Sequence, residues 1–394
     1  MSDTLDALSH GRHSSRTCGF ETTLSIIGSN GHANTANLWL ACRACMAAPA
    51  VRQDNEVGPE SDRPMLLADI ARTDSTFEEI PIIDLKDATS TDPQARRALA
   101  EKIRDACINV GFLYIKNHGI PDEVIQGAVS AAKTFFKLPL ETKMALDIHK
   151  SPNFKGYTAL LGENTDPENR GDMHEGFDIG WEEVGPTSAS REGDGTMSGS
   201  NVWPCDLPGF KEAALTYYHA CVNLGKLLFP LFAMALDEPD HFFDDKTTKP
   251  AAIMRLLYYP PQTGVVDDRV MGIGAHTDYE CFTILWQDQV QALQVLNANG
   301  KWIDAVPIPG TLVLNIGDQL ARWTNDVFKS TRHRAVNRSG VERYSIPLFF
   351  GSDYDVELHP IPSCVSEDNP PKYEVVKAGD YVRSRLEATY AHSK

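Results

Sequence analysis

Residues 274–278 read Gly-Ala-His-Thr-Asp, and a short apolar run, Phe282–Gln287, follows them. His276 and Asp278 are two residues apart, so on a strand both side chains project from the same face. One imidazole and one carboxylate can therefore reach one metal ion. His333 lies beyond a further set of predicted strands and is the candidate third ligand. Two histidines and one carboxylate on one face form the facial triad typical of non-haem Fe(II) sites.

A second pair with the same spacing follows the triad. Arg343 and Ser345 also share one strand face. Arginine presents a planar fork of donors that suits a carboxylate, and a serine hydroxyl can add one hydrogen bond. Tyr258 and Tyr259 alternate across another strand, so only one of them can face the site. The pattern therefore predicts an anion site beside the metal.

The segment after residue 250 predicts β structure. Short apolar runs recur there, separated by turn signals such as Asn299-Gly300 and Pro309-Gly310. Regularly spaced short strands favour a sandwich or jelly roll. The predicted strands are Ala252–Tyr259, Phe282–Gln287, Ala292–Leu296, Trp302–Val306, Thr311–Ile316 and Arg343–Phe350.

The segment before residue 240 predicts helices. Asp92-Pro93 is a helix start, and Gly111 is a good stop. Further helices are expected from Pro121 onward and over Lys211–Leu236, and residues 150–205 are expected to form loops. The fold class is therefore α+β, with an α-rich N-terminal region packed around a double-stranded β-helix, or jelly roll.

The composition changes along the chain and suggests three parts. Residues 1–75 are rich in Ser, Asn, Gly and Ala without a sustained period, which predicts a disordered or weakly ordered extension. Residues 78–240 form the helix-rich region, and residues 250–390 form the jelly-roll domain. A lone Cys42-x-x-Cys45 lies in the extension, and no second pair follows at zinc-finger spacing.

The charge balance disfavours two classes of partner. The 394 residues include 37 Lys and Arg against 54 Asp and Glu, a net charge of −17, which disfavours nucleic acid and anionic lipid. Eight scattered cysteines favour a reducing, cytoplasmic location. Arg12, Arg16 and many Ser and Thr residues near the N-terminus leave a mitochondrial location as the minor alternative. A monomer is the default expectation.

The motifs taken together resemble one family. The chain is similar over residues 78–390 to the iron(II)/2-oxoglutarate dioxygenases of the isopenicillin-N-synthase-like type. One departure is Leu257, where many plant members carry Asn. The matching segments are His276-x-Asp278, His333, Arg343-x-Ser345, Arg255–Pro260, Asn315–Asp318, His333–Asn337, Ile80–Leu85, Gly111–Gly119 and Phe135–Pro139.

The resemblance implies a complete set of roles. Fe(II) would bind His276, Asp278 and His333. The cosubstrate 2-oxoglutarate would chelate the metal, and its distal carboxylate would meet Arg343, Ser345 and Tyr259. With O2, such an enzyme oxidises a small organic molecule, as in secondary metabolism, and releases succinate and CO2. The outcome can be hydroxylation, desaturation or ring closure.

The substrate pocket is the part that the sequence defines least. Its candidate residues are Phe154, Tyr157, Trp323 and Phe350. For Trp323 and Phe350, a place in the hydrophobic core is equally consistent with the sequence. His174 is expected to be no ligand, because the triad is already complete. The charged segment Glu163–Arg170 is expected to be a solvated loop, although Arg170 could reach an acidic substrate.

Two other functions remain open at this point. An iron oxidase of the same fold would draw electrons from its own substrate and would not use 2-oxoglutarate, and the Arg-x-Ser pair does not exclude it. A non-catalytic small-molecule binding protein could retain the scaffold, although the intact triad weighs against this reading.

Overall fold

The computed structural model describes residues 76–166, 171–184, 199–262 and 271–391. The chain divides into two units, Met1–Gly58 and Pro59–Lys394, and all described residues belong to the second. The predicted extension over residues 1–75, with Cys42 and Cys45, lies outside the described residues, as does Arg170.

Two sheets form the centre of the described part. The larger has eight strands in the order β1-β2-β10-β7-β12-β5-β4-β3, and the smaller has the order β6-β11-β8-β9. Their bounds are Ile82–Asp84 (β1), Phe112–Lys116 (β2), Gly156–Thr158 (β3), Glu175–Ile179 (β4), Ala252–Tyr259 (β5), Ile273–His276 (β6), Phe282–Gln287 (β7), Leu293–Leu296 (β8), Trp302–Asp304 (β9), Thr311–Ile316 (β10), His333–Ala335 (β11) and Arg343–Phe350 (β12).

The predicted α+β jelly-roll architecture is confirmed, with corrections at its margins. The predicted strands over β5, β7, β10 and β12 have the observed bounds. β3 and β4 are strands within the region that was expected to be loop, and they extend the large sheet beyond β5. β1 and β2 join the opposite side of this sheet through β10. The helix-rich and jelly-roll regions therefore share one sheet.

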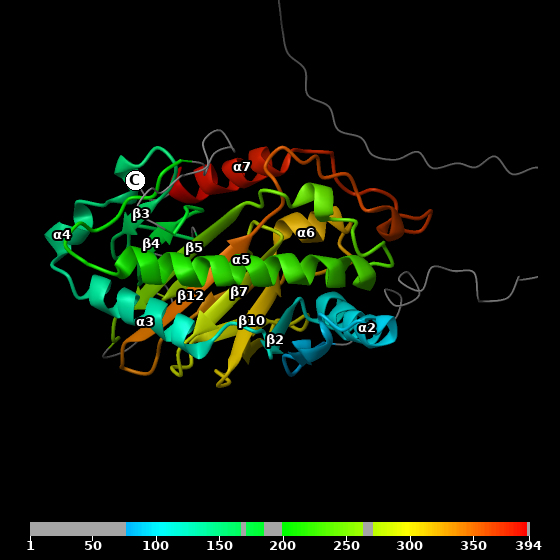
Figure 1. Ribbon diagram of the computed structural model, residues 1–394, viewed down its shortest axis with the longest axis horizontal. Helices are drawn as coiled ribbons and strands as arrows, with labels where there is room; N and C mark the ends of the chain where they lie inside the picture. Colours follow the sequence, from blue (N-terminus) through cyan, green and yellow to red (C-terminus); the bar gives the residue numbers. More distant parts are fainter. Residues whose placement is uncertain (1–75, 167–170, 185–198, 263–270, 392–394) are drawn as a thin grey trace, which may run out of the picture. The chain divides into compact units, whose positions relative to one another are not determined.

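Helices cover the outer face of the large sheet. Figure 1 shows α5 running across the strands, with α3 beside it and α2 near β2. Asp92 begins α2, because its Oδ1 accepts a hydrogen bond from the Gln94 amide at 2.9 Å. The α-helices are Pro93–Asn109 (α2), Asp122–Phe136 (α3), Leu140–Met144 (α4), Phe210–Ala235 (α5), Asp318–Trp323 (α6) and Ala378–Ala391 (α7). Short 3₁₀ turns occupy Leu85–Asp87, Ile148–Lys150, Asp244–Lys246 and Pro362–Cys364.

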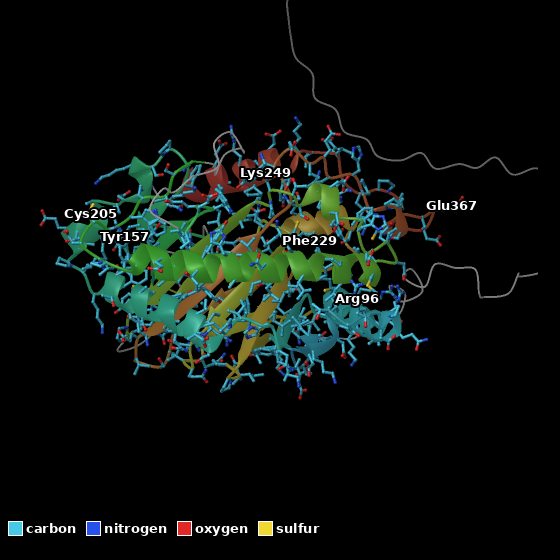
Figure 2. All side chains as sticks on the ribbon, viewed as in Figure 1. Arg96, Tyr157, Cys205, Phe229, Lys249 and Glu367 are labelled. Atoms are coloured by element: carbon cyan, nitrogen blue, oxygen red, sulfur yellow. The ribbon has the colours of Figure 1, made fainter. Side chains whose placement is uncertain are left out.

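Strand β12 separates the helix-facing core from the space between the sheets. Phe350 packs against Phe282 and Phe229, with ring centroids 5.2 and 5.6 Å away, and Phe229 comes from α5 (Figure 2). The alternate residues of β12, from Arg343 to Phe349, line a pocket on the other face. None of the described helices is both long and apolar enough to cross a membrane.

The close contact between α5 and β12 gives a stability prediction. A Cβ added at Gly225 would lie 2.3 Å from Cε2 of Phe350. Gly225→Ala is therefore expected to lower the free energy of unfolding by about 1–3 kcal/mol, measured by chemical denaturation. Gly127→Ala in α3 is the matched control, because its Cβ would meet nothing within 4 Å. Helix propensity alone should make that variant slightly more stable. Equal effects of the two substitutions would contradict the packing argument.

Candidate active site

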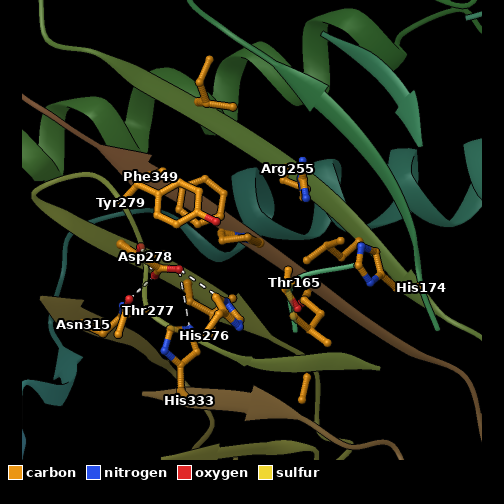
Figure 3. Close-up of a pocket in the computed structure, with 18 of the residues that line it drawn as sticks. Thr165, His174, Arg255, His276, Thr277, Asp278, Tyr279, Asn315, His333 and Phe349 are labelled. Carbon is orange, nitrogen blue, oxygen red and sulfur yellow. Dashed lines mark hydrogen bonds and ion pairs between the residues drawn. The ribbon is translucent and has the colours of Figure 1, made fainter. Parts of the chain in front are cut away.

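The three predicted ligands lie together between the sheets. His276 ends β6, His333 begins β11, and the two residues are paired directly opposite one another. Their ligand atoms and those of Asp278 all lie within 4.8 Å of one another. Each histidine Nε2 is 3.6 Å from Oδ1 of Asp278 (Figure 3). The group is thus compact enough to hold one ion.

Asp278 reaches this position by a different route from the one predicted. β6 ends at His276, so Asp278 lies in the following turn rather than on the strand. Its backbone carbonyl accepts a hydrogen bond from the Asp318 amide at 2.7 Å, at the start of α6. The contact with α6 therefore fixes the chain at Asp278. Asp278 lies beside His276 as predicted, but because of this contact and not because the two residues share a strand face.

Hydrogen bonds orient all three side chains. Nδ1 of His276 is 2.8 Å from the Gly274 carbonyl, and Nδ1 of His333 is 3.2 Å from the Thr331 carbonyl. Each Nδ1–H can donate there, which leaves Nε2 as the free electron-pair donor. Oδ2 of Asp278 accepts hydrogen bonds from Asn315 Nδ2 and Thr283 Oγ1. Oδ1 is the oxygen that remains on the histidine side.

The protonation states of Asp278 and His333 suit the binding of a cation. Burial alone would raise the pKa of Asp278, but His333 and His276 beside it hold the pKa well below its usual range. Burial, with His276 nearby, lowers the pKa of His333 to about 4. An ionised carboxylate and an uncharged imidazole are the forms that bind a metal. Two nitrogen donors and one oxygen donor on one side fit Fe(II) and leave other coordination positions open.

Asn315 supports Asp278, and its removal gives a second prediction. Asn315→Ala removes one of the hydrogen bonds that fix the carboxylate, so iron affinity is expected to fall by about 10- to 100-fold. Competition with a chelator measures this affinity. The control is Asn297→Ala, a buried asparagine that bonds the Phe77 carbonyl instead. An equal loss in both variants, or none in either, would contradict the supporting role.

The predicted anion site lies in the same pocket. Arg343 and Tyr259 are opposite one another on β12 and β5, and the guanidinium carbon is 4.7 Å from the tyrosine ring centroid. Arg343 is only 1% exposed. Its hydrogen bonds are long: 3.2 Å to the Val290 carbonyl, 3.3 Å to Gln287 and 3.5 Å to Ser345. Among the described residues, no carboxylate forms an ion pair with it.

The structure also decides which tyrosine faces the pocket. Tyr259 lines it, and its hydroxyl accepts a hydrogen bond from Ser345 Oγ at 3.4 Å. Tyr258 turns to the other face of β5, where its ring stacks on Phe136 at a centroid distance of 5.7 Å. The resemblance indicated Tyr259, and strand alternation alone could not make this choice.

Three of the four expected substrate residues lie in the core instead. Phe154 lines the pocket. Tyr157 is fully buried and donates a hydrogen bond to Glu175 at 2.6 Å. Trp323 packs edge-to-face on Phe243, and Phe350 faces α5. Phe349 lines the pocket in place of Phe350, because neighbouring residues of a strand face opposite sides.

The sequence reasoning missed a buried charge network at the pocket wall. The expectation of a solvated loop is wrong for Glu163, which is 3% exposed. Arg255 donates to Glu163 and to Asp178, each at 2.7 Å. His174, which is no member of the triad, lies 3.2 Å from Glu163. Burial raises the pKa of Asp178 to about 6 despite Arg255. The sequence did contain one signal for this network: Arg255 alternates with Leu257 and Tyr259 on the predicted strand, so it shares a face with Tyr259.

The fold and the site define a non-haem iron oxygenase. One family model, "non-haem dioxygenase in morphine synthesis N-terminal", matches residues 80–206, and the "2OG-Fe(II) oxygenase superfamily" model matches residues 250–352. The chain belongs to the 2OG-Fe(II) oxygenase superfamily. Members use Fe(II), 2-oxoglutarate and O2, and the triad described here fits that iron.

Curated relatives and solved structures agree with this assignment. The Emericella nidulans 2-oxoglutarate-Fe(II) type oxidoreductase hxnY is 39% identical, over 80% of this chain and 91% of its own. Homoarginine-6-hydroxylase 2-ODD-233 of Oryza sativa is 33% identical, over 79% of this chain and 98% of its own. A full-length Neurospora crassa protein, solved in complex with alpha-KG and thymine, aligns at a TM-score of 0.70 with 31% identity, covering 78% of this chain and 96% of that one.

Proposed function

We propose that the protein is a 2-oxoglutarate-dependent dioxygenase that hydroxylates a small organic metabolite. In this proposal His276, Asp278 and His333 hold Fe(II). Arg343, Ser345 and Tyr259 bind the distal carboxylate of 2-oxoglutarate. The observation that carries the proposal is the buried Arg343, whose hydrogen-bond partners among the described residues are a carbonyl, an amide and a hydroxyl and include no carboxylate. A buried charge is costly unless it is paired, and a dicarboxylate that also reaches the iron supplies the partner.

The residues around this site have distinct tasks. The arginine fork orients the cosubstrate, and Tyr259 packs beneath the guanidinium. Apolar residues such as Leu257 and Leu285 line the pocket and exclude water. Iron, when bound, lets O2 couple the decarboxylation of 2-oxoglutarate to the oxidation of a C–H bond. One O2 then yields succinate, CO2 and an alcohol, with one oxygen atom in succinate and the other in the alcohol.

The choice of hydroxylation follows the relatives. Homoarginine-6-hydroxylases of rice, soybean and Arabidopsis are 33–35% identical to this chain. We extend the proposal to a cytoplasmic monomer of secondary metabolism. The free thiols of all five described cysteines support a reducing compartment. Light scattering and a fluorescent fusion test the oligomeric state and the location.

Succinate formation tests the proposed function. We expect purified protein to form succinate from 2-oxoglutarate only when Fe(II) and O2 are present. A compound that accelerates this formation and gains one oxygen atom is a substrate. Oxidation of a compound at an unchanged rate without 2-oxoglutarate would overturn the proposal in favour of an iron oxidase. Ligand binding without any succinate would overturn it in favour of a binding protein.

A further inference from the structure

A carboxyl group in the pocket has no task in the proposed metal and cosubstrate sites. Glu280 follows Asp278 by two residues and lies just before β7. It lines the same pocket as the triad, and it is 5% exposed. Its Oε2 is enclosed and has no hydrogen-bond partner among the described residues. A buried polar atom without a hydrogen-bond partner costs free energy. Such an atom in a pocket therefore suggests that a bound molecule supplies the missing hydrogen bond.

The neighbouring backbone makes room for this carboxyl group. Gly351 follows the pocket-facing Phe349 by two residues, and a Cβ there would lie 2.1 Å from Oε2 of Glu280. The same Cβ would lie 3.2 Å from Cβ of Ala251. Glycine and alanine thus frame a niche that larger side chains would fill. The position of Glu280 is therefore built into the chain at the end of β12 and at the start of β5.

Two more enclosed oxygens in the pocket wall have no hydrogen-bond partner in the described parts of the chain. They are Oδ2 of Asp178 and Oγ1 of Thr165, and both residues line the pocket. All three oxygens can accept a hydrogen bond. A molecule that fills this part of the pocket can therefore satisfy them by presenting donors.

The charges in this part of the pocket point the same way. In the proposed function, bound iron would balance the charge of Asp278, and the distal carboxylate of 2-oxoglutarate would balance that of Arg343. Arg334 is turned to Gln294 and to the ring of Trp302. Within the described part of the chain, the remaining carboxyl groups that line the pocket, Glu163, Asp178 and Glu280, have Arg255 and His174 beside them as bases. Acidic groups are thus in excess where the substrate must bind.

We propose that Glu280 is a substrate-binding residue and that the substrate presents an N–H donor to its carboxyl group. The inference rests on the proposed function, because it needs iron and 2-oxoglutarate in their assigned places. A protonated amine or guanidinium and the N–H of a ring or amide share this chemistry. Specificity for such a group follows, because an analogue without the N–H leaves buried oxygens without a partner.

Matched probes test the N–H requirement. Each N–H compound is paired with a counterpart of the same skeleton that lacks the N–H donor: piperidine with tetrahydropyran, butylamine with pentane, and 2-piperidone with its N-methyl derivative. We expect succinate formation to be accelerated about tenfold more by at least one N–H member than by its counterpart. Equal responses across all pairs would overturn the inference. The first two pairs report a cationic nitrogen, and the third reports a neutral one.

Variants of Glu280 test the residue itself. Glu280→Met keeps the length but accepts no N–H bond, so the affinity for the preferred probe should fall about tenfold or more, measured by calorimetry with Mn(II) and 2-oxoglutarate. Glu280→Gln keeps a carbonyl acceptor and should restore binding of a neutral N–H probe but not of a cationic one. Unchanged affinity in both variants would overturn the assignment.

Thermal stability separates this role from a structural one. Without ligand, Glu280→Met should raise Tm, because an enclosed oxygen without a partner is removed. The control is Glu182→Gln, a buried carboxylate outside the pocket that bonds Lys211, Trp203 and Asn201. It should lower Tm and leave the N–H preference unchanged. A large fall in Tm for Glu280→Met would overturn the inference. If the unaltered protein does not bind 2-oxoglutarate, the proposed function itself is refuted, whatever the result for Glu280.

Discussion

Asp278→Ala is expected to reduce succinate formation by about 10⁶-fold or to the limit of detection, because the proposed oxidation depends on bound iron. The substitution removes the only anionic ligand of the triad and leaves two imidazoles 4.3 Å apart between ring centroids. Iron content after purification and the rate of succinate formation check this result together.

A matched aspartate gives the control for this variant. Asp304→Ala removes an exposed carboxylate on β9 that bonds only Gln294 among the hydrogen bonds described. It should keep full iron content and turnover. Asp278→Ala with undiminished iron and turnover would contradict the metal assignment.

Arg343→Lys is expected to weaken 2-oxoglutarate binding by about 10- to 100-fold while iron is retained. Lysine keeps the positive charge but loses the planar fork that can hold both oxygens of a carboxylate. Its ammonium also cannot stack on Tyr259 as the guanidinium does. Calorimetric titration of 2-oxoglutarate into the metal-loaded protein measures the change.

The chain offers a second arginine for comparison. Arg334 lies on β11, shortly before Arg343 in the sequence. Its guanidinium carbon stacks on Trp302, 4.1 Å from the ring centroid. Because Arg334 contacts Trp302 and is not part of the proposed cosubstrate site, Arg334→Lys should change the affinity for 2-oxoglutarate by no more than about twofold. Equal affinities for the protein and Arg343→Lys would rule out the assigned role of Arg343.

The grouping of His276, Asp278 and His333 could be predicted because their geometry depends on nearby sequence and on strand pairing. His276 and Asp278 are close in the chain, and β11 places His333 directly across from His276. The strand bounds were equally accessible, since β5, β7, β10 and β12 are apolar runs ended by turns. The role of α6 in fixing the turn at Asp278 depends on a tertiary contact that no local pattern shows.

The pocket wall could not be predicted because it depends on partners distant in sequence. Glu163 looks like part of a solvated loop until Arg255, on a strand far along the chain, pairs with it. The choice between Phe349 and Phe350 depends on which face of β12 meets α5. Glu280 has no local signal at all, because its niche exists only where Gly351 approaches it.

The central claim is that this triad and Arg343 together hold iron with 2-oxoglutarate. The most direct test adds Fe(II) and 2-oxoglutarate to the protein without oxygen and records the visible spectrum. The account predicts a weak metal-to-ligand charge-transfer band that is absent in His276→Ala. A protein that binds iron but shows no such band would contradict it.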